Sequence, residues 1–202
     1  YRELYRYYDT YGTYHSGRIY SDNKHYFRFD LEQDDVFELL KKIRPSVIVS
    51  ALRGPFSAQV EAHQLMVAYA QKTKCRIIFL SSANVFDAFA HYPSYEHDKT
   101  LSESIYGKLK IRCETLLMRN LPEAQYAIVR LPMVFGVGSP RMKAIKNAIL
   151  LNEAIEVFPH LIINTTTDTK CCQQLHYIIN RNCSGIFHLG SKDLVHHKEF
   201  VG

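Results

Sequence analysis

Long apolar runs and an apolar leader are both missing from this sequence of 202 residues. A membrane-spanning helix needs about eighteen or more consecutive apolar residues, and no stretch of the chain approaches that length. The chain also does not open on a charged segment followed by an apolar one, which is the pattern of a signal peptide. We therefore expect no membrane partner and a cytoplasmic location.

Cysteine is scarce, and histidine is more frequent but dispersed. The five cysteines are an odd number and include no Cys-x-x-Cys pair, so the sequence indicates neither a disulfide framework nor a zinc site. His196 and His197 are adjacent but have no third ligand at metal spacing. We expect reduced thiols in the core and no bound metal.

Runs of basic residues are missing too, although the net charge is +5. The 25 Lys and Arg are scattered among 20 Asp and Glu, and the longest basic run is Lys41–Lys42. No basic patch is interleaved with aromatic residues, as a surface that stacks nucleic-acid bases would be. We expect no nucleic-acid partner, and the mild positive charge suits a small anionic ligand.

The sequence does contain short apolar runs that alternate with helical patterns. Nearly continuous apolar runs, typical of strands buried on both faces, occur at 46–51 (SVIVSA), 76–80 and 125–131. Helical spacing occurs at 34–43, at 56–72 and in the segment that holds Tyr106. This alternation predicts an α/β fold in which helices cover both faces of a parallel sheet. Ligands of such sheets lie beyond the carboxyl ends of the strands.

The two ends of the chain carry weaker patterns. Residues 1–8 resemble the last turns of a helix, and two strands follow, one ending near His15 and one over 24–30. The last third predicts helices at 140–151 and 168–180, strands at 155–158 and 185–190, and a polar-ended strand or loop at 161–169. We expect residues 1–136 to form one domain. Residues 137–202 would form a smaller substrate lobe, interleaved with the last strand of the sheet.

Tyrosine precedes lysine by four residues at three places, Tyr20 with Lys24, Tyr95 with Lys99 and Tyr106 with Lys110. Only the last pair lies in a segment with an apolar stripe, formed by Ile105, Leu109, Leu116 and Leu117. Tyr106 and Lys110 therefore project from one face of a helix. The alternative for an isolated pair is a surface tyrosine that stacks on a lysine stem, and Tyr95 is the second candidate.

Two strand ends surround the Tyr106 pair in the sequence. Ser82 ends a buried strand 24 residues before Tyr106, and Arg130 lies at the end of the next buried strand, 24 residues after it. A hydroxyl at a strand end, facing a phenol and an ammonium on one helical face, is suited to moving a proton onto a carbonyl. This context favours a chemical role for Tyr106.

Four segments, taken in order, resemble the extended short-chain dehydrogenase/reductase family. They are SSANVFD (81–87), Tyr95-x-x-Asp98, YGKLKIRCE (106–114) and RLPMVFG (130–136). They are most similar to dTDP-4-dehydrorhamnose reductases and related nucleotide-sugar reductases and epimerases. Residues 29–54 resemble the acidic strand end, the helix and the cofactor-side strand of the same group. The resemblance runs from about Tyr8 to Gly202. It implies a Rossmann-like doubly wound parallel sheet with a small C-terminal substrate lobe.

The resemblance also implies an NAD(P)-dependent oxidoreductase that reduces a 4-keto nucleotide sugar. Tyr106 would protonate the sugar carbonyl as hydride arrives from the nicotinamide. Lys110 would lower the pKa of this phenol from its usual value near 10 and bind the cofactor ribose. Ser82 would hydrogen-bond the carbonyl oxygen, and Asn84 would lie on the substrate side.

NADP, or NAD, is the cofactor that the resemblance implies, held by residues 1–136. Asp30 would approach the adenine, with Leu31 beside it. The middle of the cofactor would be lined by Ser50, Ala51, Leu52 and Arg53. Pro132 and Val134 would flank the nicotinamide. His15, Ser16 and Arg18 follow the strand end where an acidic residue would select NAD. This non-acidic set favours NADP.

The sequence departs from the family at one point. Members of the family carry a strand and a glycine-rich turn, G-x-x-G-x-x-G, before the first helix. This chain begins inside that helix, and its nine glycines include no such cluster. That strand would lie between two strands that are present, so its loss would leave two rows of backbone groups unpaired. We therefore expect a natural protein that is longer at its N-terminus, and one that continues as a helix after 199–202.

Three interpretations follow. The first is a reductase of a 4-keto nucleotide sugar, or a related epimerase or dehydratase, which the intact set of Ser82, Tyr106 and Lys110 favours. The second is a non-catalytic nucleotide-binding regulatory protein on the same fold, which a missing glycine-rich turn would favour. The third, an RNA-associated relative, is not supported by the scattered charge. The sugar, the base and whether a homodimer forms are left open.

Overall fold

The computed structural model describes residues 1, 3–17, 20, 22–89, 93–136, 139–158, 160–192 and 194–201. Arg18, one of the predicted cofactor residues, lies outside these ranges. Within them, no helix is both long enough and apolar enough to cross a membrane.

Four parallel strands form the central sheet, in the order β3 (Val47–Ser50), β4 (Arg76–Ser82), β5 (Tyr126–Leu131) and β8 (Gly185–His188). The register pairs Ser50 with Phe79 and Ser82 with Leu131, so the carboxyl ends of neighbouring strands meet at one edge. Ile128 on β5 is fully buried. The predicted α/β fold with a parallel sheet is confirmed.

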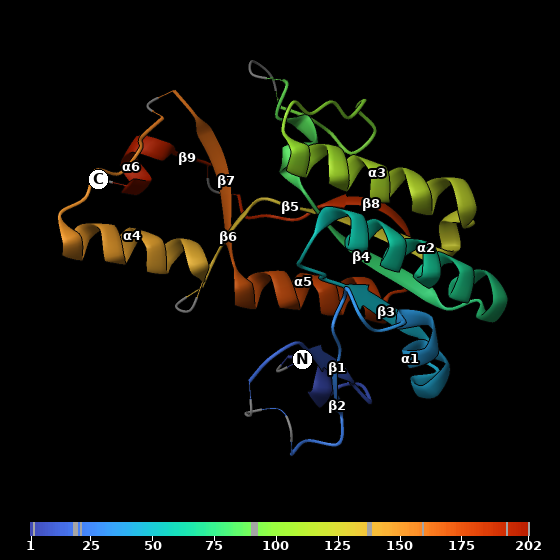
Figure 1. Ribbon diagram of the computed structural model, residues 1–202. Coiled ribbons are helices and arrows are strands. Elements are labelled where there is room, and N and C mark those ends of the chain that lie inside the picture. Colours follow the sequence, from blue (N-terminus) through green and yellow to red (C-terminus); the bar gives the residue numbers. More distant parts are fainter. Residues whose placement is uncertain are drawn as a thin grey trace.

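Helices cover both faces of this sheet (Figure 1). On one face lie α1 (Val36–Ile43), α2 (Phe56–Thr73) and α3 (Ile105–Asn120), and on the other lies α5 (Asp168–Asn180). Alternate residues of β4 point to opposite faces, so Ile77 packs in the core on the α2 and α3 side, whereas Ile78 packs against α5. Two apolar cores result, one on each face of the sheet.

Ile105 does not belong to the apolar stripe predicted for α3. Its side chain is 73% exposed, whereas Leu109 and Leu117 are buried. Ile105 is the first residue of the helix, and the buried side of that turn is occupied by Gly107. The stripe is therefore shorter at its start than the sequence predicts.

The N-terminal segment forms a separate two-stranded parallel sheet of β1 (Gly12–Tyr14) and β2 (Tyr26–Arg28), shown in dark blue in Figure 1. Within the described residues, β1 pairs only with β2, and the edge of β3 that faces away from β4 has no strand partner. The helix predicted for residues 1–8 is reduced to a single 3₁₀ turn, η1 (Leu4–Arg6), which has no buried residue to stabilise it.

A second, three-stranded sheet forms the C-terminal lobe, in the order β6 (Met133–Phe135), β7 (Ile162–Thr167) and β9 (Leu194–His196). Strand β6 is parallel to β7, and β9 is antiparallel to it. Two helices, α4 (Pro140–Leu151) and α6 (His197–Val201), accompany this sheet, and Figure 1 shows α4 well apart from the central sheet. The chain returns to the central sheet through α5 and β8.

The structure corrects one sequence prediction in this lobe and adds two strands. Residues 155–158 form no strand, and strands β6 and β9 were not predicted. The composition of these short segments does not tell which of them forms a strand. Pairing with β7 decides it. The predicted helices at 140–151 and 168–180 are confirmed. The predicted domain boundary after residue 136 falls just beyond β6.

Candidate active site

Ser82 is the last residue of β4 and opens a short 3₁₀ helix, η3 (Ala83–Phe86). Its hydroxyl oxygen accepts a hydrogen bond from the Asn84 backbone N–H at 3.2 Å, and its hydroxyl donates to Asn84 Oδ1 at 2.9 Å. The Ser82 side chain is thereby fixed at the carboxyl edge of the sheet, and Asn84 lies beside it as predicted.

Tyr106 and Lys110 lie on the first turns of α3, above the end of β4. Lys110 is buried, and its ammonium donates to the Leu80 carbonyl oxygen at 3.0 Å. The same nitrogen lies 5.5 Å from the centroid of the Tyr106 ring. Tyr106 is 42% exposed, and Ser82 lies close enough to act on the pKa of its phenol. The structure thus brings the three predicted catalytic residues together.

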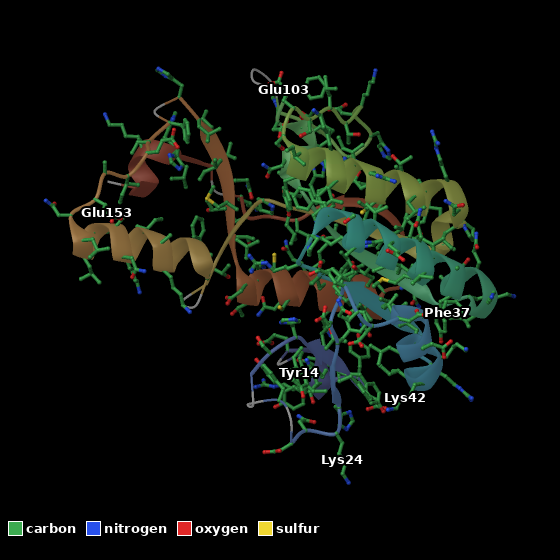
Figure 2. All side chains as sticks on the ribbon, in the orientation of Figure 1. Tyr14, Lys24, Phe37, Lys42, Glu103 and Glu153 are labelled. Atoms are coloured by element: carbon green, nitrogen blue, oxygen red, sulfur yellow. The ribbon has the colours of Figure 1, made fainter. Side chains whose placement is uncertain are left out.

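The start of α3 is held against η3 by a group of hydrogen bonds to Asp87. The carboxylate accepts from the Ser102 hydroxyl and from the Glu103 backbone N–H, both at 2.7 Å, and from the Ser104 hydroxyl. Ser104 is also the N-cap of α3, where it accepts from the Gly107 N–H. Figure 2 labels Glu103 in this loop. Asp87 therefore fixes the helix that carries Tyr106 relative to the strand end that carries Ser82.

The electrostatics around Tyr106 differ from the prediction. Burial raises the pKa of the Tyr106 phenol, while the hydrogen bond with Ser82 and the positive charge of Arg53 act to lower it. Burial lowers the pKa of Lys110, and Cys113 and Glu114 oppose this shift. Arg53 is therefore a cation, not predicted from the sequence, whose charge acts to lower the pKa of the Tyr106 phenol.

The segment after β3 carries four predicted cofactor residues, and they lie in different environments. Ser50 is buried, and its hydroxyl is bonded to His63 Nε2 at 2.9 Å, so its side chain is directed into the core. Leu52 packs against the same core, whereas Ala51 and Arg53 are exposed beyond the strand end. Of these four residues, Ala51 and Arg53 present side chains that a ligand could reach freely.

A second group of predicted cofactor residues meets at the ends of β1 and β2. His15 Nε2 lies 3.4 Å from Asp30 Oδ2, and Ser16 is exposed beside it. The pKa of Asp30 is lowered, chiefly by the hydrogen bond from the Glu32 N–H. Leu31 packs against the main core. Figure 2 labels Tyr14, the residue before His15, in this sheet.

A pocket of about 490 Å³ opens beside the Ser82 turn. Ala83, Arg130, Pro132 and His188 contribute to its wall, so it lies at the carboxyl ends of β4, β5 and β8. Pro132 is the one predicted site residue that lines it, and Val134 lies further along in β6, where it pairs with Thr166. No group of three described His, Cys, Asp or Glu residues could hold a metal ion.

Comparison with known proteins identifies the family. The model of the RmlD substrate binding domain matches residues 53–201, about three quarters of the chain. The chain belongs to this family. No curated protein is significantly similar to it in sequence.

Solved structures agree with the family on the fold. The dTDP-4-dehydrorhamnose reductase of Clostridium acetobutylicum is 19% identical, with a TM-score of 0.77 over 95% of this chain and 77% of its own. A hypothetical dTDP-4-dehydrorhamnose reductase from Sulfolobus tokodaii is 18% identical, with a TM-score of 0.83 over 99% of this chain and 74% of its own. The dTDP-glucose 4,6-dehydratase of Bacillus anthracis, solved with NAD, is 13% identical, with a TM-score of 0.81 over 99% and 73%. At these identities the likeness establishes the Rossmann-like fold.

One part of the site was not predicted from the sequence of this RmlD-like chain. Glu114 on α3 and Arg130 on β5 form a buried ion pair, in which Arg130 Nη2 lies 2.8 Å from Glu114 Oε2. The side chain of Arg130 is 3% exposed and that of Glu114 is 1% exposed. The Ser81 hydroxyl donates to the same carboxylate. The sequence contains one indication of this ion pair: Glu114 is an acidic residue four positions after Lys110 and therefore lies on the same buried helical face.

Proposed function

We propose that this protein is an NADP-preferring oxidoreductase that reduces the keto group of a 4-keto nucleotide sugar, with Tyr106 as the proton donor. The observation that carries this proposal is the convergence of Ser82, Tyr106 and Lys110 at the carboxyl end of β4. Membership of the RmlD substrate binding domain family supports the nucleotide-sugar substrate. The structural neighbours include enzymes solved with NAD and with NADP.

The chemistry of the three side chains suits the addition of a proton to a carbonyl oxygen. Burial raises the pKa of Tyr106, which keeps the phenol protonated and able to donate at neutral pH. Ser82, beside it, can hold the carbonyl oxygen in place. Lys110 is anchored on the Leu80 carbonyl and keeps its charge next to the Tyr106 ring, where it favours the phenolate that forms when the proton leaves.

The residues present fit one half of a nicotinamide cofactor. Arg53 and Ala51 are exposed beyond β3, Lys110 presents a buried ammonium, and His15 and Ser16 follow β1 without an acidic side chain at their own positions. Ala51 and Arg53 would line the middle of the cofactor, Lys110 would bind the ribose, and His15 and Ser16 would face the adenosine phosphate. When bound, NADPH would supply the hydride that adds to the carbonyl carbon.

Titration with NADPH, followed by cofactor fluorescence and by turnover of a dTDP-4-keto sugar, tests the proposal. We expect Tyr106→Phe to bind NADPH with nearly unchanged affinity and to lose turnover by roughly a hundredfold or more. Tyr95→Phe is the matched control, because Tyr95 also precedes a lysine by four residues but is 65% exposed. It should keep normal turnover. A folded protein that does not bind NADPH, or equal turnover in Tyr106→Phe, would sink the proposal.

A second candidate function is a non-catalytic nucleotide-binding regulatory protein on the same fold. The raised pKa of Tyr106 bears on this candidate as well: it keeps the phenol protonated, but it also makes the proton harder to transfer. The same titration separates the two candidates. Binding of NADPH without turnover of keto sugars by the unmodified protein would favour the regulatory function.

A further inference from the structure

Four helices end at the edge of the central sheet that is opposite the candidate site. The helices α1, α2, α3 and α5 each end a few residues before the start of β3, β4, β5 and β8, respectively. Because these strands are parallel, their starts share one edge, which is the amino edge of the sheet. There the Arg76 N–H donates to the Ser46 carbonyl oxygen at 3.0 Å, which brings the end of α1 and the end of α2 side by side.

Exposed basic residues are concentrated where α1 and α2 reach the amino edge. The last turn of α1 carries Lys41 and Lys42, and Arg44 is its C-cap. The last turn of α2 carries Lys72, and Lys74 is its C-cap. All of these side chains are exposed, and Figure 2 labels Lys42 on α1. Together they form the basic edge, at the opposite end of the strands from the candidate site.

The positive charge of the basic edge is largely unpaired within the chain. Lys41 forms an ion pair with Glu38 at 2.7 Å, and no other member of the basic edge forms one with a described residue. The ammonium groups of Lys41 and Lys72 lie over the same Phe37 ring, 5.7 and 5.1 Å from its centroid. Like charges held this close repel one another, and a bound anion would relieve the repulsion.

Two of these cations occupy positions that glycine would fill with less strain. Arg44 and Lys74 adopt left-handed backbone conformations, with φ of 54° and 60°. This region is strained for a residue with a β-carbon, and glycine is the usual residue just after a helix that ends in this way. Lys42 and Lys72 already supply the cation that the negative end of each helix dipole favours. The two caps therefore add positive charge and reduce stability.

The acidic run of the chain, residues 30–35, is engaged at the other end of α1. Asp30 Oδ1 accepts from the Glu32 N–H, and Asp34 Oδ2 accepts from the Asp30 N–H. Asp35 is the N-cap of α1. These carboxylates are tied to their own loop, so a second copy of the chain is a poor source of negative charge for the basic edge. A different molecule is the better source.

The surroundings of the basic edge favour the carboxylates of a protein over a membrane or a nucleic acid. Among the described residues, the last turns of α1 and α2 expose no large apolar side chain that could insert into a bilayer. The Phe37 ring is covered by two ammonium groups, so a nucleic-acid base could not stack on it. Lysine is a compact point charge that pairs with a single carboxylate.

We propose that the basic edge is a docking surface for an acidic segment of a partner protein, whose aspartate and glutamate side chains pair with Arg44, Lys72 and Lys74. Part of the net charge of +5 then serves this partner and not a small ligand at the candidate site. The inference does not depend on the proposed function, because the basic edge and the candidate site lie at opposite ends of the same strands.

Titration of a fluorescein-labelled octaglutamate peptide with the full chain, followed by fluorescence anisotropy, tests the proposal. We expect binding at low salt that weakens as the salt concentration rises. A single-stranded oligonucleotide of matched charge and phosphatidylserine vesicles should bind more weakly than the peptide. Equal or tighter binding of either would overturn the proposal, and so would absence of peptide binding at low salt.

Glycine variants separate a binding role from a structural one. The double variant of Arg44→Gly and Lys74→Gly should unfold at a higher urea concentration than the wild type, because glycine relieves the strain at both caps. It should bind the peptide about fivefold more weakly at low salt, because two exposed ion pairs are lost. Lys72→Gln, at an unstrained position, should weaken binding about twofold.

The matched control removes the same charge from the C-terminal lobe. Lys143→Gln with Lys146→Gln changes two exposed lysines of α4 and should leave peptide binding unchanged. A loss of binding in this control as large as in the glycine variant would show that net charge alone acts, and would overturn the proposal. Unchanged binding in the glycine variant would also overturn it. Self-association of the wild-type chain that the glycine variant abolishes would assign the basic edge to a second copy instead.

Discussion

At the scale of single residues, the candidate site is held by hydrogen bonds that are local in space but distant in sequence. Lys110 is a residue that would ordinarily be exposed, and it stays buried because the Leu80 carbonyl oxygen accepts from its ammonium. Ser82 is fixed by Asn84, two residues on. The Tyr-x-x-x-Lys spacing predicts that Tyr106 and Lys110 share a helical face, but it does not predict that Arg53 lies close enough to act on the phenol.

Removing the charge of Arg53 should raise the pKa of Tyr106 further. Burial already raises it, and Arg53 is one of two groups that oppose the shift. A higher pKa keeps the phenol protonated to higher pH, so Arg53→Gln should move its ionisation to a more alkaline pH. The measurement is an ultraviolet titration of tyrosinate, taken as the difference between each protein and its Tyr106→Phe counterpart.

Arg181→Gln is the control for this titration, because Arg181 lies at the far end of α5, over Tyr177. It should leave the Tyr106 titration unchanged. An Arg53→Gln protein in which Tyr106 ionises at the same or a lower pH than in the wild type would contradict the electrostatic account.

At the scale of elements, α3 is the helix on which the site depends, and it is fixed at two points. Its first turn is tied to η3 through Asp87, and its middle is tied to β5 through the buried pair of Glu114 and Arg130. The sequence predicts the helix that carries Tyr106 and the strand before it. It does not predict either tie, because both join residues whose proximity is created only when the elements pack.

Loss of the Asp87 carboxylate should disturb catalysis more than cofactor binding. Asp87→Ala removes the carboxylate that accepts three hydrogen bonds at the start of α3, so Tyr106 should shift relative to Ser82. Misplacement of this kind costs roughly ten- to a hundredfold in turnover. We expect kcat to fall while the KM for NADPH changes little. Steady-state kinetics give this split.

Asp98→Ala is the comparison for Asp87→Ala. Among the described residues, the Asp98 carboxylate accepts from the Tyr95 N–H within its own loop and not from α3, so its removal should leave kcat near the wild-type value. A KM effect in Asp87→Ala with unchanged kcat would argue against a positioning role for Asp87.

Removal of the Glu114 charge should destabilise the fold strongly. Glu114→Gln leaves the buried guanidinium of Arg130 without its counter-ion, and loss of one partner of a buried pair costs about 3–5 kcal/mol. The free energy of unfolding in urea measures this. Glu38→Gln breaks the exposed pair of Glu38 with Lys41 and should cost under about 1 kcal/mol. Similar losses in the two variants would refute this ranking.

At the scale of the whole molecule, the three sheets of the described residues differ in how far they are covered and buried. The central sheet has helices on both faces, and β4 and β5 each have a strand on either side. The β1–β2 sheet has two short strands with no buried residue, and the three-stranded sheet of the C-terminal lobe contains one buried residue, Thr166, among its strands. Figure 1 shows the two smaller sheets apart from the central one, with β1 and β2 below it and β6, β7 and β9 to its left.

Amide hydrogen exchange should follow this order. Amides of β4 and β5 should exchange slowest, because they are paired on both edges and covered on both faces, so their exchange needs global unfolding. Amides of β1 and β2 should exchange fastest among the strands. Exchange measured by mass spectrometry on peptides from these strands tests the order, and equal protection of β1 and β4 would contradict it.

The sequence by itself determined the central sheet, its covering helices and the trio of Ser82, Tyr106 and Lys110. Apolar runs such as 46–51 and the helical spacing around Tyr106 are set by local periodicity, which neighbouring residues reveal. Only the tertiary structure decided which short segments became β6 and β9, that Ser50 turns inward to His63, and that Gln174 and His188 share a pocket with Ala83. Those outcomes depend on pairing and burial between segments far apart in the chain, and no local pattern encodes them.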